Sequence, residues 1–146
     1  MNEALVLLAE DNPDDALLTR RAFAKNGFEN PITVVADGEA CLQALLPEPG
    51  REALEPALVL LDINLPKISG LDVLARLRAD PRTRTVPVVI LTTSRERSDV
   101  AAGYRLGANS YVCKPVSFTG FVALVRTLAT YWLELNEPCP RPGPAR

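Results

Sequence analysis

The 146-residue sequence contains no histidine. Histidine is the side chain most often used for proton transfer near neutral pH, and it is a common metal ligand. Its absence excludes histidine-based acid–base catalysis, histidine metal ligation and autophosphorylation on histidine. Most hydrolase mechanisms are removed with them.

A surplus of basic residues is also missing. The chain has 16 Lys and Arg against 18 Asp and Glu, which gives a formal net charge of −2. Proteins that bind nucleic acid use a cationic surplus to contact the phosphate backbone. We therefore expect no DNA binding by this chain itself.

Cysteines are few and long apolar runs are absent. Cys41, Cys113 and Cys139 are odd in number and lack CxxC spacing, which argues against a disulfide framework and a zinc site. The first residues have no positive segment, and their apolar run stops after a few residues. Neither a secretory signal nor a membrane span is predicted, so we expect a cytoplasmic protein with no membrane association.

Hydrophobic residues make up 47% of the chain and charged residues 23%, the balance of an ordinary globular protein. The length suits one domain with one core. We predict a single domain over residues 1–137. The Pro-rich segment 138–146 is predicted to be a flexible tail that does not pack.

Short apolar runs alternate with longer segments of helical composition. The predicted strands are 4–9, 32–35, 57–61, 86–91 and 109–112. Four of them are continuously apolar, as in parallel strands that are covered on both faces. The predicted helices are 14–25, 38–46, 70–79 with Ser69 as N-cap, 98–106 and 118–135. Strand and helix alternation predicts an α/β fold: a doubly wound, five-stranded parallel sheet with five helices, of flavodoxin-like type.

Polar residues gather where the predicted strands end. Glu10 and Asp11 follow the first strand, Asp62 the third, Thr92 the fourth and Lys114 the fifth. Ligands of such sheets bind outside the carboxyl ends of the strands. We therefore expect these side chains to form one site.

Three carboxylates in one crevice repel one another unless a cation lies among them. Hard oxygen ligands favour Mg²⁺, and the main-chain oxygen of Asn64 could complete the protein's share. A carboxylate beside a divalent cation, a lysine and a hydroxyl is equipped to accept a phosphoryl group. Asp62 is the predicted nucleophile.

The same motifs, in the same order, resemble the receiver domain of bacterial two-component response regulators. They are Glu10-Asp11-Asn12, Asp62 within LLDINLPKISG, Thr92 within ILTTS, and Lys114-Pro115. The resemblance covers residues 4–135. The segments DNPDDALLTRRAF, NLPKISGLDVL and GYRLGANSYVCKPV are similar to single-domain regulators that partner phytochrome-type and related hybrid sensor histidine kinases.

The resemblance implies a role for each acid. Asp11 and Asp62 would bind Mg²⁺ directly, Glu10 would act through water, and Asn64 would offer its main-chain oxygen. It implies no enzyme activity beyond the chain's own phosphorylation and dephosphorylation.

The resemblance also implies a switch. Thr92 would hydrogen-bond the phosphoryl group and Lys114 would pair with it. The Lys114-Pro115 peptide is expected to be cis. Tyr111 would turn inward as Thr92 moves toward the phosphate, so that a local charge change alters a surface.

Several alternatives stay open at this point. Asp14 or Asp15 is expected to cap the first helix. Ser94 lies where the family tunes the lifetime of the phosphate, and Cys113 is interpreted as a small packed side chain. A Mg²⁺-dependent aspartyl phosphatase would need a second Asp at position 64, where Asn64 stands. A pseudo-receiver adaptor that binds its partner without phosphorylation is the other alternative.

The last predicted helix carries a wide apolar arc. Phe118, Phe121, Val122, Val125, Ala129 and Trp132 form one core stripe at helical spacing. A second set widens the arc beyond what one sheet face requires: Leu124, Leu128, Tyr131 and Leu135. We predict a homodimer through the last helix and its neighbouring strand, with this second set at the interface. The alternative is that the loop 47–56 or the tail covers these side chains. The expected partner is a sensor histidine kinase.

Overall fold

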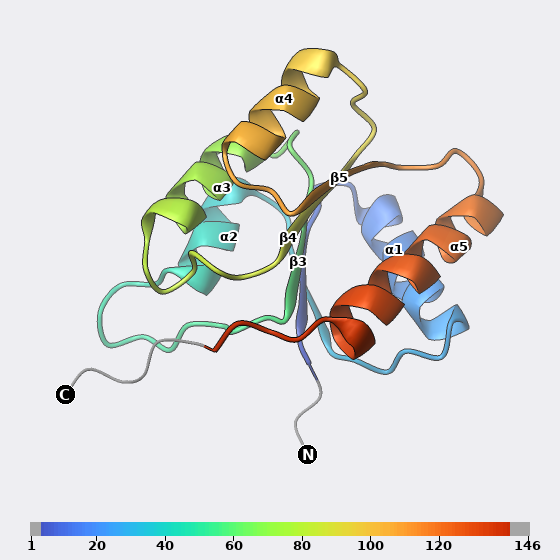
Figure 1. The fold of residues 1–146 in the computed structure, drawn as a ribbon, viewed down its shortest axis with the longest axis horizontal. Helices are drawn as coiled ribbons and strands as arrows, with labels where there is room; N and C mark the ends of the chain where they lie inside the picture. Colours follow the sequence, from blue (N-terminus) through green and yellow to red (C-terminus); the bar gives the residue numbers. More distant parts are fainter. Residues whose placement is uncertain (1–3, 141–146) are drawn as a thin grey trace.

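The fold of the chain is seen in a computed structural model, which describes residues 4–140. Five parallel strands form one sheet in the order β2-β1-β3-β4-β5 (Figure 1). The strands are β1 (Val6–Ala9), β2 (Ile32–Val35), β3 (Leu58–Leu61), β4 (Val88–Thr92) and β5 (Ser110–Cys113). This order is that of the flavodoxin-like doubly wound sheet, as predicted, and the strand order reverses direction between β1 and β3.

Helices cover both faces of the sheet. They are α1 (Pro13–Lys25), α2 (Gly38–Leu45), α3 (Gly70–Ala79), α4 (Arg97–Arg105), α5 (Phe118–Ala129) and the π-helix η1 (Thr130–Leu135). Helices α1 and α5 lie on one side of the sheet, and α2, α3 and α4 on the other (Figure 1). The predicted elements are all present, and apart from the last helix their ends either coincide with the prediction or differ from it by one or two residues.

The three central strands, β1, β3 and β4, are buried on both faces, which is why they are almost entirely apolar, whereas the edge strands β2 and β5 are half-buried. Side chains of a strand point alternately to the two faces. In β1, Val6 and Leu8 join the core under α1 and α5, whereas Leu7 and Ala9 join the core under α2 and α3. The sheet thus separates two apolar layers and fixes the positions of the residues that follow each strand.

The N-cap of α1 is Asn12, not the predicted Asp14 or Asp15. The Asn12 side chain accepts hydrogen bonds from the main-chain N–H groups of Asp14 and Asp15, and Pro13 is the first helical residue. Proline suits that position because its φ is already helical and it has no N–H to leave unsatisfied. The cap therefore falls one residue before Pro13, and both acids lie inside the first turn.

The last helix is not one continuous α-helix, as predicted over 118–135. It is α-helical to Ala129 and then forms η1, whose end is closed by Asn136 N–H donating to Tyr131 O at 2.6 Å. A π turn holds one more residue than an α turn, so side chains of η1 rotate away from positions projected at 3.6 residues per turn.

Two side chains of this region differ from the prediction in their burial. Leu128 is buried, with 8% exposure, because it follows Phe121 by seven residues and Val125 by three and so shares their stripe. It cannot belong to an exposed dimer face. Phe118, predicted to be in the core, is 39% exposed at the start of α5.

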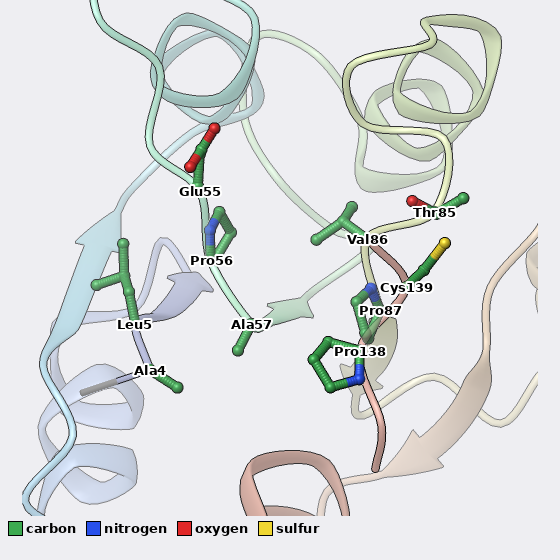
Figure 2. A pocket seen from close by; sticks show the side chains of 10 residues that line it. All are labelled: Ala4, Leu5, Glu55, Pro56, Ala57, Thr85, Val86, Pro87, Pro138 and Cys139. Atoms are coloured by element: carbon green, nitrogen blue, oxygen red, sulfur yellow. The ribbon is translucent and has the colours of Figure 1, made fainter. Parts of the chain in front are cut away.

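The first residues of the predicted tail lie beside the amino end of the sheet. Pro138 and Cys139 line a pocket of about 310 Å³ together with residues that precede β1, β3 and β4 (Figure 2). The rest of the predicted tail, 141–146, lies outside the described residues. Among the described residues, no helix is both long and apolar enough to span a membrane.

Candidate functional site

Asp62 is the first residue after the central strand β3, at the carboxyl end of the sheet. It is buried, with 7% exposure, and its carboxylate is hydrogen-bonded on both oxygens. Oδ1 accepts from the Thr92 hydroxyl at 2.9 Å and from Asn64 N–H at 2.9 Å, and Oδ2 accepts from Lys114 Nζ at 3.1 Å. A buried carboxylate requires such partners. Thr92 ends the neighbouring strand β4, and Lys114 follows the edge strand β5.

The loop after Asp62 lies so close to α3 that Gly70 is required. A Cβ on Gly70 would stand 2.2 Å from the main-chain oxygen of Asp62. The glycine N–H donates to Ile63 O at 2.9 Å. The motif LLDINLPKISG therefore ends in glycine because the start of α3 is packed directly on the backbone of the acidic residue.

Lys114 follows β5, and its ammonium lies among three carboxylates. It pairs with Glu10, with Asp62 at 3.1 Å and with Asp15 at 3.3 Å. Burial would lower the pKa of Lys114, but the hydrogen bond to Glu10 and the charge of Asp62 outweigh burial and raise it to about 12. The lysine is therefore cationic at neutral pH.

Glu10 and Asp11 follow β1 and differ in environment. Glu10 is buried, with 4% exposure, whereas Asp11 is exposed. Burial raises the pKa of Glu10 against the opposing effect of Lys114. Glu10 also accepts a hydrogen bond from Asn12 N–H at 3.2 Å, so the acid is fixed to the start of α1.

A second set of contacts connects this site to the loop between β4 and α4. The Tyr111 hydroxyl donates to Ser94 O at 2.9 Å, and Cys113 Sγ lies 3.5 Å from the same oxygen. The Ser94 hydroxyl donates to Asp99 Oδ2 at 2.6 Å. Ser94 thus joins β5 to the first turn of α4.

The Lys114-Pro115 peptide is trans, because residues 4–140 contain no cis peptide bond. The expected cis bond is therefore wrong for this structure. The trans form is favoured by about 0.5–1 kcal/mol for a peptide before proline. Lys114 still faces the acids, since its main-chain N–H donates to Thr92 O at 2.8 Å and holds the residue in line with β5.

The donor set is chemically suited to a hard divalent cation. Glu10, Asp11 and Asp62 offer carboxylate oxygens at neighbouring strand ends, which are the ligands that Mg²⁺ prefers. Within residues 4–140, no group of three or more His, Cys, Asp or Glu is arranged as a metal centre. In this arrangement Lys114 itself stands between Glu10 and Asp62.

The structure brings Glu10, Asp62, Thr92 and Lys114 together as predicted, and Tyr111 contacts the adjoining loop. Sequence reasoning missed Asp15 as a partner of Lys114, because it was interpreted only as a cap. Its position in the first turn of a helix that follows Glu10-Asp11 directly was the available signal.

The family model for the response regulator receiver domain matches residues 6–126. The probable methanogenesis regulatory protein FilR2 of Methanothrix harundinacea is 42% identical over 97% of this chain and 89% of that protein. The response regulator Rcp1 of Synechocystis sp. is 34% identical over 89% of each.

Solved structures agree with these matches. The phosphorylated cyanobacterial phytochrome response regulator RcpA has a TM-score of 0.87 and 32% identity, over 93% of this chain and 98% of that one. The Mn²⁺-bound form of Rcp1 has a TM-score of 0.85 and 32% identity, over 94% and 99%. The chain therefore belongs to the receiver-domain family of two-component response regulators.

Proposed function

We propose that this chain is a stand-alone response regulator that accepts a phosphoryl group on Asp62 from a phosphohistidine of a sensor kinase. The observation that carries the proposal is the placement of Asp62. It is a buried carboxylate at the carboxyl end of the central strand, held by the Thr92 hydroxyl and the Lys114 ammonium. Membership of the receiver family supports it.

In the proposed transfer, an Asp62 oxygen attacks phosphorus, the P–N bond of the donor breaks, and an acyl phosphate forms. The electron pair of the broken bond leaves with the donor imidazole. Lys114 would pair with the phosphoryl oxygens, and the Thr92 hydroxyl would donate to one of them. The chain is proposed to act on no other substrate and to catalyse only its own phosphorylation and dephosphorylation.

Mg²⁺ is the proposed cofactor. Glu10, Asp11, Asp62 and the main-chain oxygen of Asn64 would hold it, and a cation there neutralises charge on the transferring group. The Mn²⁺-bound structure of Rcp1 supports a divalent ion in this family.

Thr92 and Tyr111 are the proposed switch. Thr92 contacts the acceptor, and Tyr111 contacts the next loop through Ser94 O. A phosphoryl group on Asp62 would change the hydrogen bond made by Thr92, and the loop between β4 and α4 would carry the change to the surface.

The proposed partner is a sensor histidine kinase of phytochrome or related hybrid type. Support comes from the likeness to RcpA, a phytochrome response regulator. Signalling is proposed to proceed through protein contacts, without DNA binding.

A homodimer through the end of the last helix is the second proposed partner interaction. Tyr131 is 49% exposed and Leu135 is 69% exposed, whereas Leu124 is half-buried. Exposed apolar side chains on neighbouring turns favour a protein contact. With Leu128 buried, the proposed face is narrower than the sequence predicted.

Phosphoryl acceptance is tested by incubating the full chain with acetyl phosphate and Mg²⁺ and measuring intact mass. One added phosphoryl group is expected, with none in Asp62→Asn or in EDTA. Asp14→Asn is the matched control, since Asp14 lies in the same first turn as Asp15 and pairs with no described cation. No added mass in any sample, together with no binding of beryllofluoride, would contradict phosphoryl acceptance and favour an adaptor that binds its partner without phosphorylation.

The dimer is tested by sedimentation of Leu135→Glu and of Tyr131→Glu. Both substitutions are expected to shift the chain toward the monomer. Leu17→Glu is the control, because Leu17 is also exposed but lies on α1. A mass unchanged by either η1 substitution would contradict the proposed face.

A further inference from the structure

Arg78, at the end of α3, is a half-buried cation with no role in the proposed chemistry. Its guanidinium donates to five neutral oxygens from two other segments of the chain, and three of these oxygens share the two N–H groups of Nη1. The acceptors are Gly107 O at 2.8 Å, Thr83 O at 3.3 Å, Arg84 O at 3.1 Å, Val86 O at 2.8 Å and Asn109 Oδ1 at 2.9 Å. None of the ion pairs among residues 4–140 involves Arg78.

The segments held by Arg78 meet at the amino end of the sheet. Residues 83–86 lead into β4, and residues 107–109 connect α4 to β5. Asn109 Oδ1 also accepts from Val88 N–H at 2.8 Å, so the same oxygen serves Arg78 and the first residue of β4. Only arginine offers five donors in a rigid planar fork, and lysine cannot replace that geometry.

The fit of Gly107 to Arg78 is close. Gly107 has φ of +105°, which glycine adopts readily, and a Cβ there would lie 2.8 Å from Arg78 Cγ. The turn that ends α4 is therefore built around the arginine side chain. Leu106 also packs against the core on that side of the sheet.

The other end of α4 is held far less firmly. Its N-cap residue, Glu96, makes no side-chain cap hydrogen bond within the described chain. Of the nine described residues of α4, only Gly103, near its end, is buried. The Ser94–Asp99 hydrogen bond is the side-chain contact that joins the first turn to the preceding loop.

We propose that Arg78 is a clamp that fixes the C-terminal end of α4 to α3 and to the start of β4, so that α4 moves at its N-terminal end. Arg78 is a positioning residue, and it lies at the amino end of the sheet, opposite Asp62. The direction of the movement rests on the proposed function, because the change is taken to start at the loop after Thr92. The hydrogen bonds that make Arg78 a clamp do not depend on the proposed function.

The clamp is tested by hydrogen exchange of the unmodified full chain. In Arg78→Met, and to a smaller degree in Arg78→Lys, the amides of 106–109 are expected to exchange at least about tenfold faster, because several oxygens at this turn and before β4 lose a charged donor. The control is Arg76→Met, which changes an exposed arginine two residues earlier in α3. Equal exchange in Arg78→Lys and Arg76→Met, with both folded by circular dichroism, would overturn the clamp.

The movement is tested by adding beryllofluoride and Mg²⁺ to the parent chain. Changes in exchange are expected over 94–100 and not over 104–109, and in Arg78→Lys they should extend to 109. Changes spread evenly along α4 in the parent would overturn this step. If beryllofluoride fails to bind and acetyl phosphate adds no mass, the proposed function fails, while the comparison of Arg78→Lys with Arg76→Met still decides the clamp.

Discussion

The two ends of the sheet each hold a half-buried cation, and the two cations are satisfied in opposite ways. At the carboxyl end, Lys114 lies among three carboxylates, and its pKa is raised to about 12. At the amino end, Arg78 is surrounded by neutral oxygens, and burial lowers its pKa below the ordinary value of a guanidinium.

This difference separates a site that is proposed to change its charge from a structural contact that keeps its charge. An ammonium is a compact charge on a flexible stem, and it can exchange a carboxylate for a phosphoryl group without rebuilding its surroundings. A guanidinium that donates in fixed directions to oxygens of two segments loses several of these hydrogen bonds if either segment moves. The chain therefore uses lysine where a ligand is proposed to arrive and arginine where segments are held.

The largest effect is expected for Lys114→Met. Removing the lysine leaves buried Glu10 and Asp62 without their cation, and breaking a buried pair in this way costs about 3–5 kcal/mol. Urea unfolding at pH 7 with EDTA measures the change in free energy of unfolding. The control is Lys67→Met, whose ion pair with Asp37 at 3.6 Å is exposed and is worth no more than about 1 kcal/mol. Equal losses in the two variants would contradict the special position of Lys114.

Arg78 provides the matching experiment at the other end. Arg78→Met is expected to lose about 3 kcal/mol of unfolding free energy, because several carbonyls lose a charged donor at once. Arg78→Lys should lose about 2 kcal/mol, since the lysine ammonium cannot reach residues 83–86 and residues 107–109 at once. Arg76→Met should stay within about 0.5 kcal/mol. A neutral Arg78→Lys in the same urea titration would show that charge alone, without the planar fork, is enough.

The pH dependence sharpens the comparison further. The pKa of Lys114 is raised from 10.5 to about 12, so its contribution to stability is fully present below pH 10.5 and is lost as pH rises through 12. The loss is on the order of 2 kcal/mol. Urea unfolding between pH 9.5 and about 12 should show the stability difference between the parent and Lys114→Met shrinking by that amount. A constant difference over this range would contradict the raised pKa.

The smallest effect is expected for Ser94→Ala, which removes the hydroxyl that contacts Asp99 but keeps the oxygen that accepts from Tyr111. A loss of about 1 kcal/mol is expected, with the near-ultraviolet circular dichroism of tyrosine unchanged. Ser98→Ala, at an exposed position of α4, is the control. A changed tyrosine signal would mean that the hydroxyl also positions the ring.

The sequence predicted most of the fold, because continuous apolar strands and capped helices are local patterns. Ser69 caps α3, as expected from its place before Gly70. The prediction failed where neighbours along the chain did not decide the outcome. Projection at 3.6 residues per turn could not foresee η1. The assignment of Leu128 to the dimer face was a different kind of error, because its helical spacing from Phe121 and Val125 already placed it on the core stripe.

The candidate site shows the same division. Glu10, Asp62, Thr92 and Lys114 could be assigned from strand ends, because the carboxyl ends of parallel strands meet at one edge. The sequence could not predict three other features: the trans peptide before Pro115, the contact of Asp15 with Lys114, and the contacts made by Ser94. Each depends on how a loop or first helical turn packs against a strand distant in sequence.

By itself, the sequence determined the α/β class, the order of strands and helices, and which acids, hydroxyl and lysine lie where strands end. Hydrophobic periodicity and residue chemistry are properties of short segments and can be read directly. Tertiary structure alone decided which residues contact Lys114 and Arg78. A hydrogen bond from Arg78 to Gly107, or an ion pair from Lys114 to Asp15, joins residues 29 or 99 positions apart. Such contacts exist only once the sheet has brought those segments together.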